Sequence, residues 1–232
     1  MIEAYLERAS SYAGDIDNLF TLIFWIVVAW GGLAEIILFY FCFRFRKKDG
    51  EKGQYITGEE KHQKKWIAIP HYLVLFFDVF LIAGAISVWY NIKQRLPEDP
   101  DFTVGVTAQQ WAWTFRHPGE DGVLHTADDI QTIDELHLIE NATYLFELES
   151  RDVLHSFSVP VFRLKQDAIP GRKITGWFKP TMKGEWDIQC TEICGIGHGL
   201  MPARVIITSA YDHQQWLSQQ TPIPPSPGLA SN

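Results

Sequence analysis

Two long apolar runs dominate the N-terminal part of the chain. Leu19–Phe43 and Trp66–Tyr90 each hold 25 residues, and each contains a single acidic side chain, Glu35 or Asp78. An α-helix of about 20 apolar residues crosses the hydrocarbon core of a bilayer, so both runs can span it with some tilt or with buried ends. We therefore predict transmembrane helices at 19–43 and 66–90. The alternative, two buried helices of a soluble protein, is disfavoured by this length.

After Tyr90 the pattern changes to short segments in which apolar and polar positions alternate. Pro97 and Pro100 end the helical pattern. Short strands between Gly and Pro turns are typical of a β-sandwich or a Greek-key barrel. The segments rich in β-branched and aromatic residues, which we predict as strands, are 102–107, 111–115, 135–139, 143–148, 156–159, 174–178, 185–188 and 203–208. A short helix is expected over Asp212–Leu217.

Together these elements predict six successive parts of the chain. They are an N-terminal segment 1–18, a first span 19–43, a loop 44–65, a second span 66–90, an all-β domain 91–217 and a Pro-rich tail 218–232. The first run is too long and begins too late for a signal peptide, so we expect it to be retained as an anchor.

Charge predicts the orientation of these parts. The loop 44–65 holds eight Lys or Arg against four acids, and the positive-inside rule places such a loop in the cytoplasm. The β-domain and both termini are then expected on the outer, periplasmic side. Residues 91–232 hold 11 basic and 18 acidic side chains, which is −7 of the chain's −8. This field attracts a cationic partner, and no nucleic-acid partner is expected.

Candidate metal chemistry is concentrated between Cys190 and Met201. This stretch places two thiols, an imidazole and a thioether close together, with glycines that suit a tight loop. A second imidazole, His155, stands 35 positions before Cys190. Soft sulfur ligands mixed with imidazole favour copper over calcium, magnesium or manganese. Two Cys, two His and one Met are more than one copper ion needs, so we predict a site for two.

A disulfide between Cys190 and Cys194 in an exported domain is one alternative, and a zinc site is another. Neither of them needs the thioether of Met201, and for that reason copper is the favoured interpretation. Cys42, at the end of the first apolar run, is expected to be a small buried side chain without a partner.

The segment Cys190–Pro202 resembles the copper A motif of cytochrome c oxidase subunit II, C-x-E-x-C-G-x-x-H-x-x-M-P, at every motif position. Two further blocks, Val153–Phe157 and Lys165–Arg172, agree with that family in order and spacing, and the similarity covers about residues 15–216. The resemblance implies a cupredoxin-like Greek-key barrel for the β-domain. The expected fold class is therefore an N-terminal two-helix transmembrane hairpin followed by an all-β cupredoxin-like domain.

The resemblance also implies the ligands of a binuclear copper A centre. The side chains concerned are His155, Cys190, Cys194, His198 and Met201. The two thiolates would bridge the copper ions, each imidazole would cap one ion, and the thioether would be a weak axial ligand. The backbone carbonyl of Glu192 is implied as the other axial ligand, and its side chain as a magnesium ligand at the interface with subunit I.

Trp111-Ala-Trp113 resembles the aromatic patch through which electrons reach the copper site in this family. By position, Trp111 is the indole expected nearest the donor, although this chain has Ala112 where relatives commonly have Tyr. Alternation along a strand sends Trp111 and Trp113 to the same face, so packing in the sandwich is the alternative. No C-x-x-C-H motif occurs, so we expect no haem in this chain.

Several polar features complete the sequence analysis. The acid-rich segment 116–134 predicts a solvated hairpin, and calcium binding is the alternative, although the spacing does not fit the twelve-residue calcium loop. Glu35 and Asp78 would be costly in lipid and are expected to face protein partners. Gln63 stands where the family has a Glu at the mouth of a proton path. Since Gln does not titrate, no proton-path residue is assigned.

The predicted function is that of subunit II of a respiratory haem-copper oxidase in a bacterial inner membrane. It would take electrons from a periplasmic cytochrome c-type donor and pass them to the haem of subunit I. That subunit, with its haems and copper B, would reduce oxygen to water and pump protons. Subunit III and membrane lipid are further expected partners. The alternatives are a copper-free quinol oxidase subunit II and a membrane-tethered copper-handling cupredoxin.

Overall fold

The computed structural model describes residues 6–53 and 55–223. The chain divides into two compact units. One is the helical unit, residues 18–90, and the other joins the N-terminal segment up to Asp17 with the chain from Asn91 onward. Most of the predicted Pro-rich tail, residues 224–232, lies outside the described residues.

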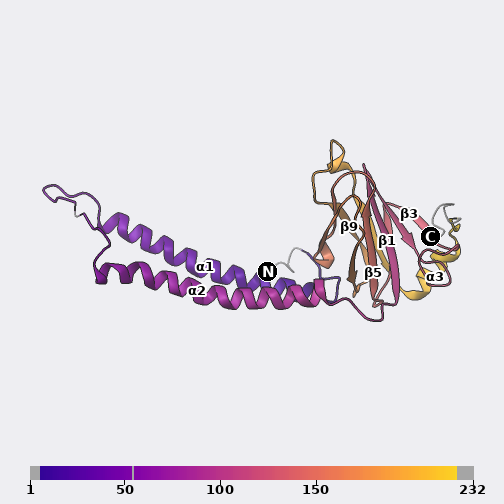
Figure 1. Cartoon of the computed structure of the whole chain (residues 1–232), viewed down its shortest axis with the longest axis horizontal. Helices are drawn as coiled ribbons and strands as arrows, with labels where there is room; N and C mark the ends of the chain where they lie inside the picture. The colour runs from indigo at the N-terminus through magenta and orange to yellow at the C-terminus, as the bar shows by residue number, and fades with distance from the viewer. Residues whose placement is uncertain (1–5, 54, 224–232) are drawn as a thin grey trace. The chain divides into compact units, whose positions relative to one another are not determined.

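Two long helices make up the helical unit (Figure 1). Helix α1 covers Ala13–Arg44, helix α2 covers Lys61–Trp89, and a π-helical turn η2 follows over Tyr90–Gln94. Both helices are long and apolar enough to cross a membrane, and none of their most apolar stretch is buried within the chain. A core helix of a soluble protein would be buried, so these helices need an apolar medium outside the chain.

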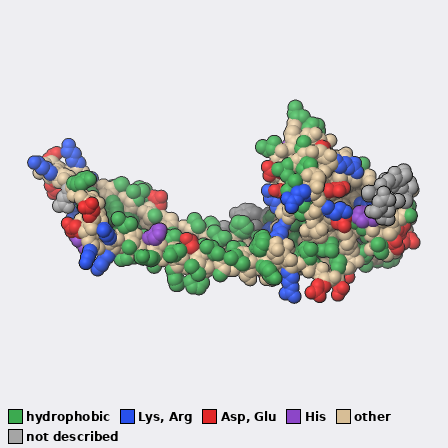
Figure 2. All heavy atoms as spheres, viewed as in Figure 1, with side chains coloured by type: hydrophobic (Ala, Val, Ile, Leu, Met, Phe, Trp, Pro, Cys, Tyr) green, Lys and Arg blue, Asp and Glu red, His purple; other side chains and the backbone are tan. Residues whose placement is uncertain are grey.

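The surface of the helical unit matches that requirement. Hydrophobic side chains cover the face of the helices seen in Figure 2, and Lys and Arg gather near the loop that joins them. Cys42 is a free thiol on helix α1. It is exposed, so the expectation that it is buried was wrong, because it belongs to this outward apolar surface. Glu35 and Asp78 are also exposed on the helices.

Ten strands lie between the π-helical turn and Ile223, the last residue that the structure describes. They are β1 (Phe102–Gln109), β2 (Ala112–His117), β3 (Ile130–Ile133), β4 (Glu135–Ile139), β5 (Tyr144–Ser150), β6 (His155–Val159), β7 (Leu164–Ala168), β8 (Ile174–Phe178), β9 (Gly184–Cys190) and β10 (Ala203–Thr208). One sheet has the order β3-β2-β1-β5-β8 and the other β4-β10-β9-β6-β7. The short 3₁₀ turns η3 (Pro160–Phe162) and η4 (His198–Leu200) and helix α3 (Ala210–Ser218) complete the chain. The β-sandwich predicted from the sequence is confirmed.

The sequence analysis missed two strands, β3 and β7. Each lies at the edge of its sheet. An edge strand has one hydrogen-bonded neighbour and carries more polar residues, so its apolar alternation is weak. The segment Leu164–Ala168 illustrates this, because Lys165, Gln166 and Asp167 lie between its two buried ends.

The two sheets enclose an aromatic core centred on Phe157 of strand β6. Its ring lies 5.5 Å from that of Trp113 and 5.9 Å from that of Phe146, measured between ring centroids. All three side chains are fully buried. Edge-to-face pairs of this kind add about 0.5–1.5 kcal/mol each beyond the burial of apolar area. The core therefore holds β6 rigidly, together with the residue at its start, His155.

The N-terminal segment is part of the β-domain. Backbone hydrogen bonds run from the N–H of Ala9 to the carbonyl of Val161 at 2.9 Å, and from the N–H of Thr181 to the carbonyl of Ala9 at 2.9 Å. The segment thus bridges two loops of the sandwich, although the sequence analysis treated it as a separate part. Hydrophobic periodicity does not reveal such backbone pairing.

A buried ion pair also holds the N-terminal segment against the β-domain. The Arg163 guanidinium donates to both carboxylate oxygens of Asp17, at 2.7 and 2.9 Å. Its other N–H groups donate to the carbonyls of Glu7, Pro160 and Leu6 at 3.0, 2.9 and 3.0 Å. All five N–H donors of the guanidinium are therefore satisfied. Removing one partner of such a buried pair costs about 3–5 kcal/mol.

Candidate metal centre

The pairing of strands β6 and β9 brings His155, the first candidate ligand in the chain, close to Cys190. Strand β6 pairs antiparallel with strand β9, and Phe157 stands opposite Cys190. His155 precedes Phe157 by two residues, so both side chains point to the same face of β6. The imidazole Nδ1 of His155 lies 3.9 Å from the Cys190 Sγ atom. The sandwich therefore joins two segments that lie 35 positions apart in the sequence.

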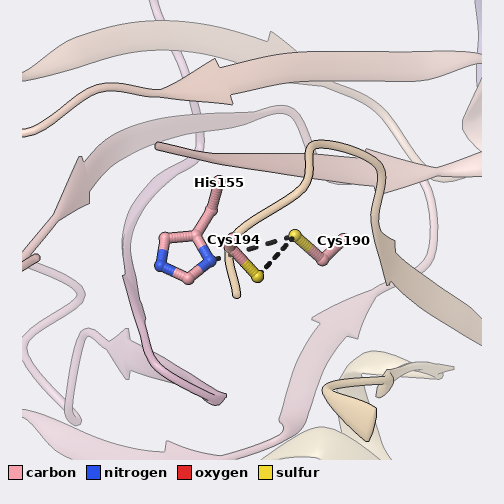
Figure 3. Close-up of side chains that lie close together, drawn as sticks. All are labelled: His155, Cys190 and Cys194. Atoms are coloured by element: carbon pink, nitrogen blue, oxygen red, sulfur yellow. Dashed lines mark hydrogen bonds between the residues drawn. The ribbon is translucent and has the colours of Figure 1, made fainter. Parts of the chain in front are cut away.

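The loop after strand β9 supplies the remaining candidates. The Sγ atoms of Cys190 and Cys194 are 3.8 Å apart. Nδ1 of His198 lies 3.6 Å from the Cys194 Sγ atom, and Sδ of Met201 lies 3.4 Å from it. All five predicted side-chain ligands thus converge on one place. Figure 3 shows three of them, His155, Cys190 and Cys194.

The carbonyl oxygen of Glu192 lies at the same place, 3.3 Å from the Cys190 Sγ atom, which donates to it. The Glu192 side chain is partly exposed. Among the described residues, the only set of three or more His, Cys, Asp or Glu side chains that meets at one point is His155, Cys190 and Cys194. Their ligand atoms all lie within 4.8 Å of one another.

The donor set fits copper. A disulfide requires a sulfur–sulfur distance of about 2.05 Å, whereas these sulfur atoms are 3.8 Å apart and both thiols are free. A structural zinc site is complete with four Cys or His ligands and leaves the adjacent thioether of Met201 without a role. Two thiols that can ionise, two imidazoles and a thioether suit copper, and a backbone carbonyl can serve copper as a weak further ligand.

The interior position of the cluster affects its proton chemistry. His155 is fully buried, and Cys194 and Met201 are 3% and 2% exposed. Burial, reinforced by the neighbouring Cys190 thiol, raises the pKa of the Cys194 thiol to about 11. Without a cation nearby this thiol therefore keeps its proton at neutral pH. A metal must displace that proton, so metal binding at this site releases protons.

Two tryptophans pack against the metal loop in different ways. Trp113 is fully buried, and its indole N–H donates to the carbonyl of Met201 at 3.1 Å. Trp111 lies in the turn between strands β1 and β2, is 38% exposed, and directs its indole N–H to the Cys194 carbonyl at 3.3 Å. Because Trp111 lies outside strand β2, the two indoles do not share a strand face as the sequence analysis assumed.

Gly197 allows this close contact between Trp111 and the loop. A Cβ atom at position 197 would lie 2.3 Å from the Trp111 ring. By contrast, a Cβ atom at Gly199 would have no neighbour within 4 Å. The absence of a side chain at 197 is therefore what lets the indole lie directly on the backbone of the ligand loop.

The sequence analysis did not identify two residues of this site, Asp152 and Gln110. Nε2 of His155 lies 2.9 Å from a carboxylate oxygen of Asp152. The side-chain amide of Gln110 donates to the Cys194 carbonyl at 2.8 Å. Burial acts to raise the pKa of Asp152, but hydrogen bonds from the Gln110 and Val153 backbone and from His155 outweigh it and lower the pKa. Asp152 is therefore ionised at neutral pH.

The acid-rich segment adopts a self-capped loop. Asp128 accepts hydrogen bonds from the Thr126 hydroxyl at 2.5 Å and from the Asp121 backbone N–H at 3.1 Å. Asp129 accepts from the His125 backbone N–H at 2.9 Å. These carboxylates thus serve the fold of their own loop. Gln63 has a similar local role, because its side chain accepts from the Gly58 backbone N–H at 2.9 Å.

Comparisons with known proteins identify the family of the chain. The family model for the cytochrome c oxidase subunit II periplasmic domain matches residues 102–209. An alternative cytochrome c oxidase subunit 2 of Bradyrhizobium diazoefficiens is 32% identical over 229 residues, which cover 89% of this chain and 80% of that protein. A cytochrome c oxidase subunit 2 of Cereibacter sphaeroides is 30% identical over 241 residues, covering 91% and 78%.

Among solved structures, the periplasmic domain of cytochrome oxidase subunit II of Bradyrhizobium japonicum is similar, with 27% identity and a TM-score of 0.48. It covers 53% of this chain and 95% of that one. The fold and the cluster define a membrane-anchored protein with a cupredoxin-like domain and a sulfur-rich candidate copper site. On the identity and coverage of its relatives, the chain belongs to the cytochrome c oxidase subunit II family.

Proposed function

We propose that this chain is the electron-accepting subunit of a respiratory haem-copper oxidase and that it carries a binuclear copper A centre. The observation that carries the proposal is the convergence of the predicted side-chain ligands at one place in a cupredoxin-like domain. When bound, the two copper ions would hold one electron at a time. That electron would come from a c-type cytochrome and would pass to the haem of subunit I.

The chain's own residues have distinct roles in this proposal. Cys190 and Cys194 would supply two thiolates shared by both ions once their protons are displaced, because their sulfur atoms lie only 3.8 Å apart. The imidazoles of His155 and His198 each point a nitrogen at one of these sulfurs. Met201 and the Glu192 carbonyl complete the set as weak neutral donors. Sharing one electron over two metal ions keeps bond-length changes small, which favours fast transfer.

Trp111 is proposed as the side chain nearest to the electron donor. It is the exposed aromatic residue in contact with the Cys194 carbonyl, so it links the surface to a ligand of the cluster. The negative charge of residues 91–232 would draw a cationic donor toward this domain. The partly exposed Glu192 side chain is proposed to bind magnesium where the domain meets subunit I.

The proposed topology places the β-domain in the periplasm and the loop 44–65 in the cytoplasm of a bacterial inner membrane. The basic loop supports this orientation. The N-terminal segment and the β-domain form one unit, so helices α1 and α2 must cross as a hairpin with both ends on the same side. Glu35 and Asp78 would then meet subunit I or subunit III, since neither is suited to lipid.

Oxygen uptake by the purified native complex tests the proposal. We expect turnover with a reduced c-type cytochrome and none with a quinol as the only donor. Turnover with the quinol alone would instead indicate a quinol oxidase. If the chain were purified without haem-containing partners and delivered copper to an acceptor protein, a copper-handling role would replace the proposed one.

A further inference from the structure

A continuous set of hydrogen bonds joins the two segments that carry the metal ligands. It begins at His155, whose Nε2 atom lies 2.9 Å from Oδ1 of Asp152. The other carboxylate oxygen of Asp152 accepts from the Gln110 backbone N–H at 2.7 Å. The Gln110 side-chain amide then donates to the carbonyl of Cys194 at 2.8 Å. The connection thus passes from one ligand to another through the turn between β1 and β2.

The first contact orients the ring of His155. A carboxylate oxygen of Asp152 is a hydrogen-bond acceptor beside Nε2, and Nδ1 on the other side of the ring faces the Cys190 Sγ atom. His155 is fully buried, so water does not offer its Nε2 atom an alternative acceptor.

The second contact determines where Cys194 lies. The loop after Cys190 runs through residues with no regular structure until the η4 turn, so no strand pairing fixes its backbone. The Cys194 carbonyl accepts two side-chain hydrogen bonds, at 2.8 Å from Gln110 and at 3.3 Å from Trp111. These two donors anchor the loop to the body of the sandwich.

We propose that Asp152 and Gln110 are positioning residues. Asp152 holds the ring of His155 and Gln110 holds the backbone of Cys194, both before and after the metal binds. Asp152 also sets the reduction potential of the bound metal. This inference rests on the proposed function. Partners of metal-bound His typically change metal affinity by about 10- to 100-fold when they are removed. A carboxylate next to the ligand shell also stabilises the more positive, oxidised state of the metal.

The test uses the full-length chain, loaded with copper and purified in detergent, with four variants. Asp152→Asn retains an acceptor for His155 but loses the charge, so we expect copper to be retained and the potential to rise. Asp152→Ala loses both, and we expect copper affinity to fall about 10- to 100-fold in competition with a chelator. Gln110→Leu should lose copper to the chelator faster than the parent chain.

Asp187→Asn is the matched control. It removes one negative charge from an exposed residue of strand β9 that pairs with Arg204 at 3.1 Å. We expect its copper affinity and potential to equal those of the parent. If Asp152→Ala does not fold, Asp152→Asn decides the question, because Asn has nearly the size of Asp and a full copper content shows that the site is intact when the potentials are compared.

The inference is overturned if Asp152→Asn has the same potential as Asp187→Asn, or if Gln110→Leu and Asp152→Ala release copper at the parent's rate. A parent chain that binds no copper pair would overturn the proposed function itself, before any variant is compared. The two failures are therefore distinguishable.

Discussion

The β-domain holds two clusters that contain histidine, and they differ in what the imidazoles face. In the candidate metal centre, ring nitrogens of His155 and His198 point at sulfur atoms 3.9 and 3.6 Å away. In the second group, which we call the Trp216 cluster, His117, His137 and His213 surround the ring of Trp216. His137 stacks on that ring with centroids 4.0 Å apart and an interplanar angle of 11°.

Two imidazoles of the Trp216 cluster have side-chain partners, whereas Nδ1 of His213 is buried without a hydrogen-bond partner among the described residues. Nε2 of His117 lies 3.1 Å from the Thr132 hydroxyl, and Nε2 of His137 lies 3.2 Å from a Glu135 carboxylate oxygen. Burial is the main cause that lowers the pKa of His117 to about 3 and that of His213 to about 4. These side chains thus act as neutral aromatic residues. The comparison shows that residue types alone do not make a metal site. The donor atoms must also converge on one point.

The largest expected effect is on metal content, which should fall after a substitution in the candidate metal centre and should stay the same after one in the Trp216 cluster. Cys194→Ser removes a proposed bridging thiolate, so we expect loss of the copper pair and of its mixed-valence electron spin resonance spectrum. Cys42→Ser changes a thiol on helix α1, and His137→Gln changes the Trp216 cluster. Both should keep the full copper content. Copper loss in His137→Gln, or an unchanged spectrum in Cys194→Ser, would contradict the distinction.

The second prediction concerns the backbone of the metal loop. A side chain at position 197 would collide with the Trp111 ring, whereas one at 199 has open space. Gly197→Ala should therefore displace the indole or the loop and reduce oxygen turnover with a c-type cytochrome by more than tenfold. Gly199→Ala should retain parental turnover. Equal rates for the two variants would argue against a role for the Trp111 contact.

The third prediction uses acid to test the Trp216 cluster. The folded-state pKa of His117 lies below its ordinary value of 6.5, so its contribution to stability is complete above pH 6.5 and is lost as the pH falls below it. At pH 5 this loss amounts to about 2 kcal/mol for His117 alone. Urea unfolding of the copper-free chain in detergent at pH 7.5 and pH 5 measures the difference.

Two variants assign the acid effect. His213→Phe keeps an aromatic ring beside Trp216 without a titrating group, and it should lose less stability between pH 7.5 and pH 5 than the parent. His62→Gln, which changes an exposed side chain in the first turn of helix α2, should behave as the parent does. If His213→Phe and the parent lose the same stability, the Trp216 cluster does not titrate as described.

The smallest effect is expected at Met201, the proposed weak ligand. Met201→Leu preserves the buried volume but removes the thioether, so two copper ions should remain bound while the reduction potential shifts. Met182→Leu, on a loop where the side chain is 37% exposed, is the matched control. A potential equal in Met201→Leu and Met182→Leu would show that the thioether does not contact the metal.

Sequence reasoning identified the proposed ligands because four of the five side chains lie in one short loop with an unusual set of sulfur and nitrogen donors. It also predicted the β-sandwich, because central strands alternate clearly. The edge strands β3 and β7 carried too little apolar alternation to be found. Asp152 and Gln110 are ordinary polar residues whose role depends on a turn and a loop that meet only in the folded domain.

The ion pair between Arg163 and Asp17 was beyond prediction for a related reason. These residues lie 146 positions apart, and neither belongs to a motif. Their pairing depends on how the N-terminal segment crosses the sandwich, which is a consequence of tertiary packing. Charged residues of this kind give no periodic signal, so the sequence alone placed the segment outside the β-domain.

The metal content and electron spin resonance spectrum of the copper-loaded, full-length chain test the central claim most directly. The account predicts two copper ions per chain, no zinc, and a seven-line spectrum from one electron shared equally by two copper nuclei. Zinc in place of copper, or a single copper ion with a four-line spectrum, would contradict it.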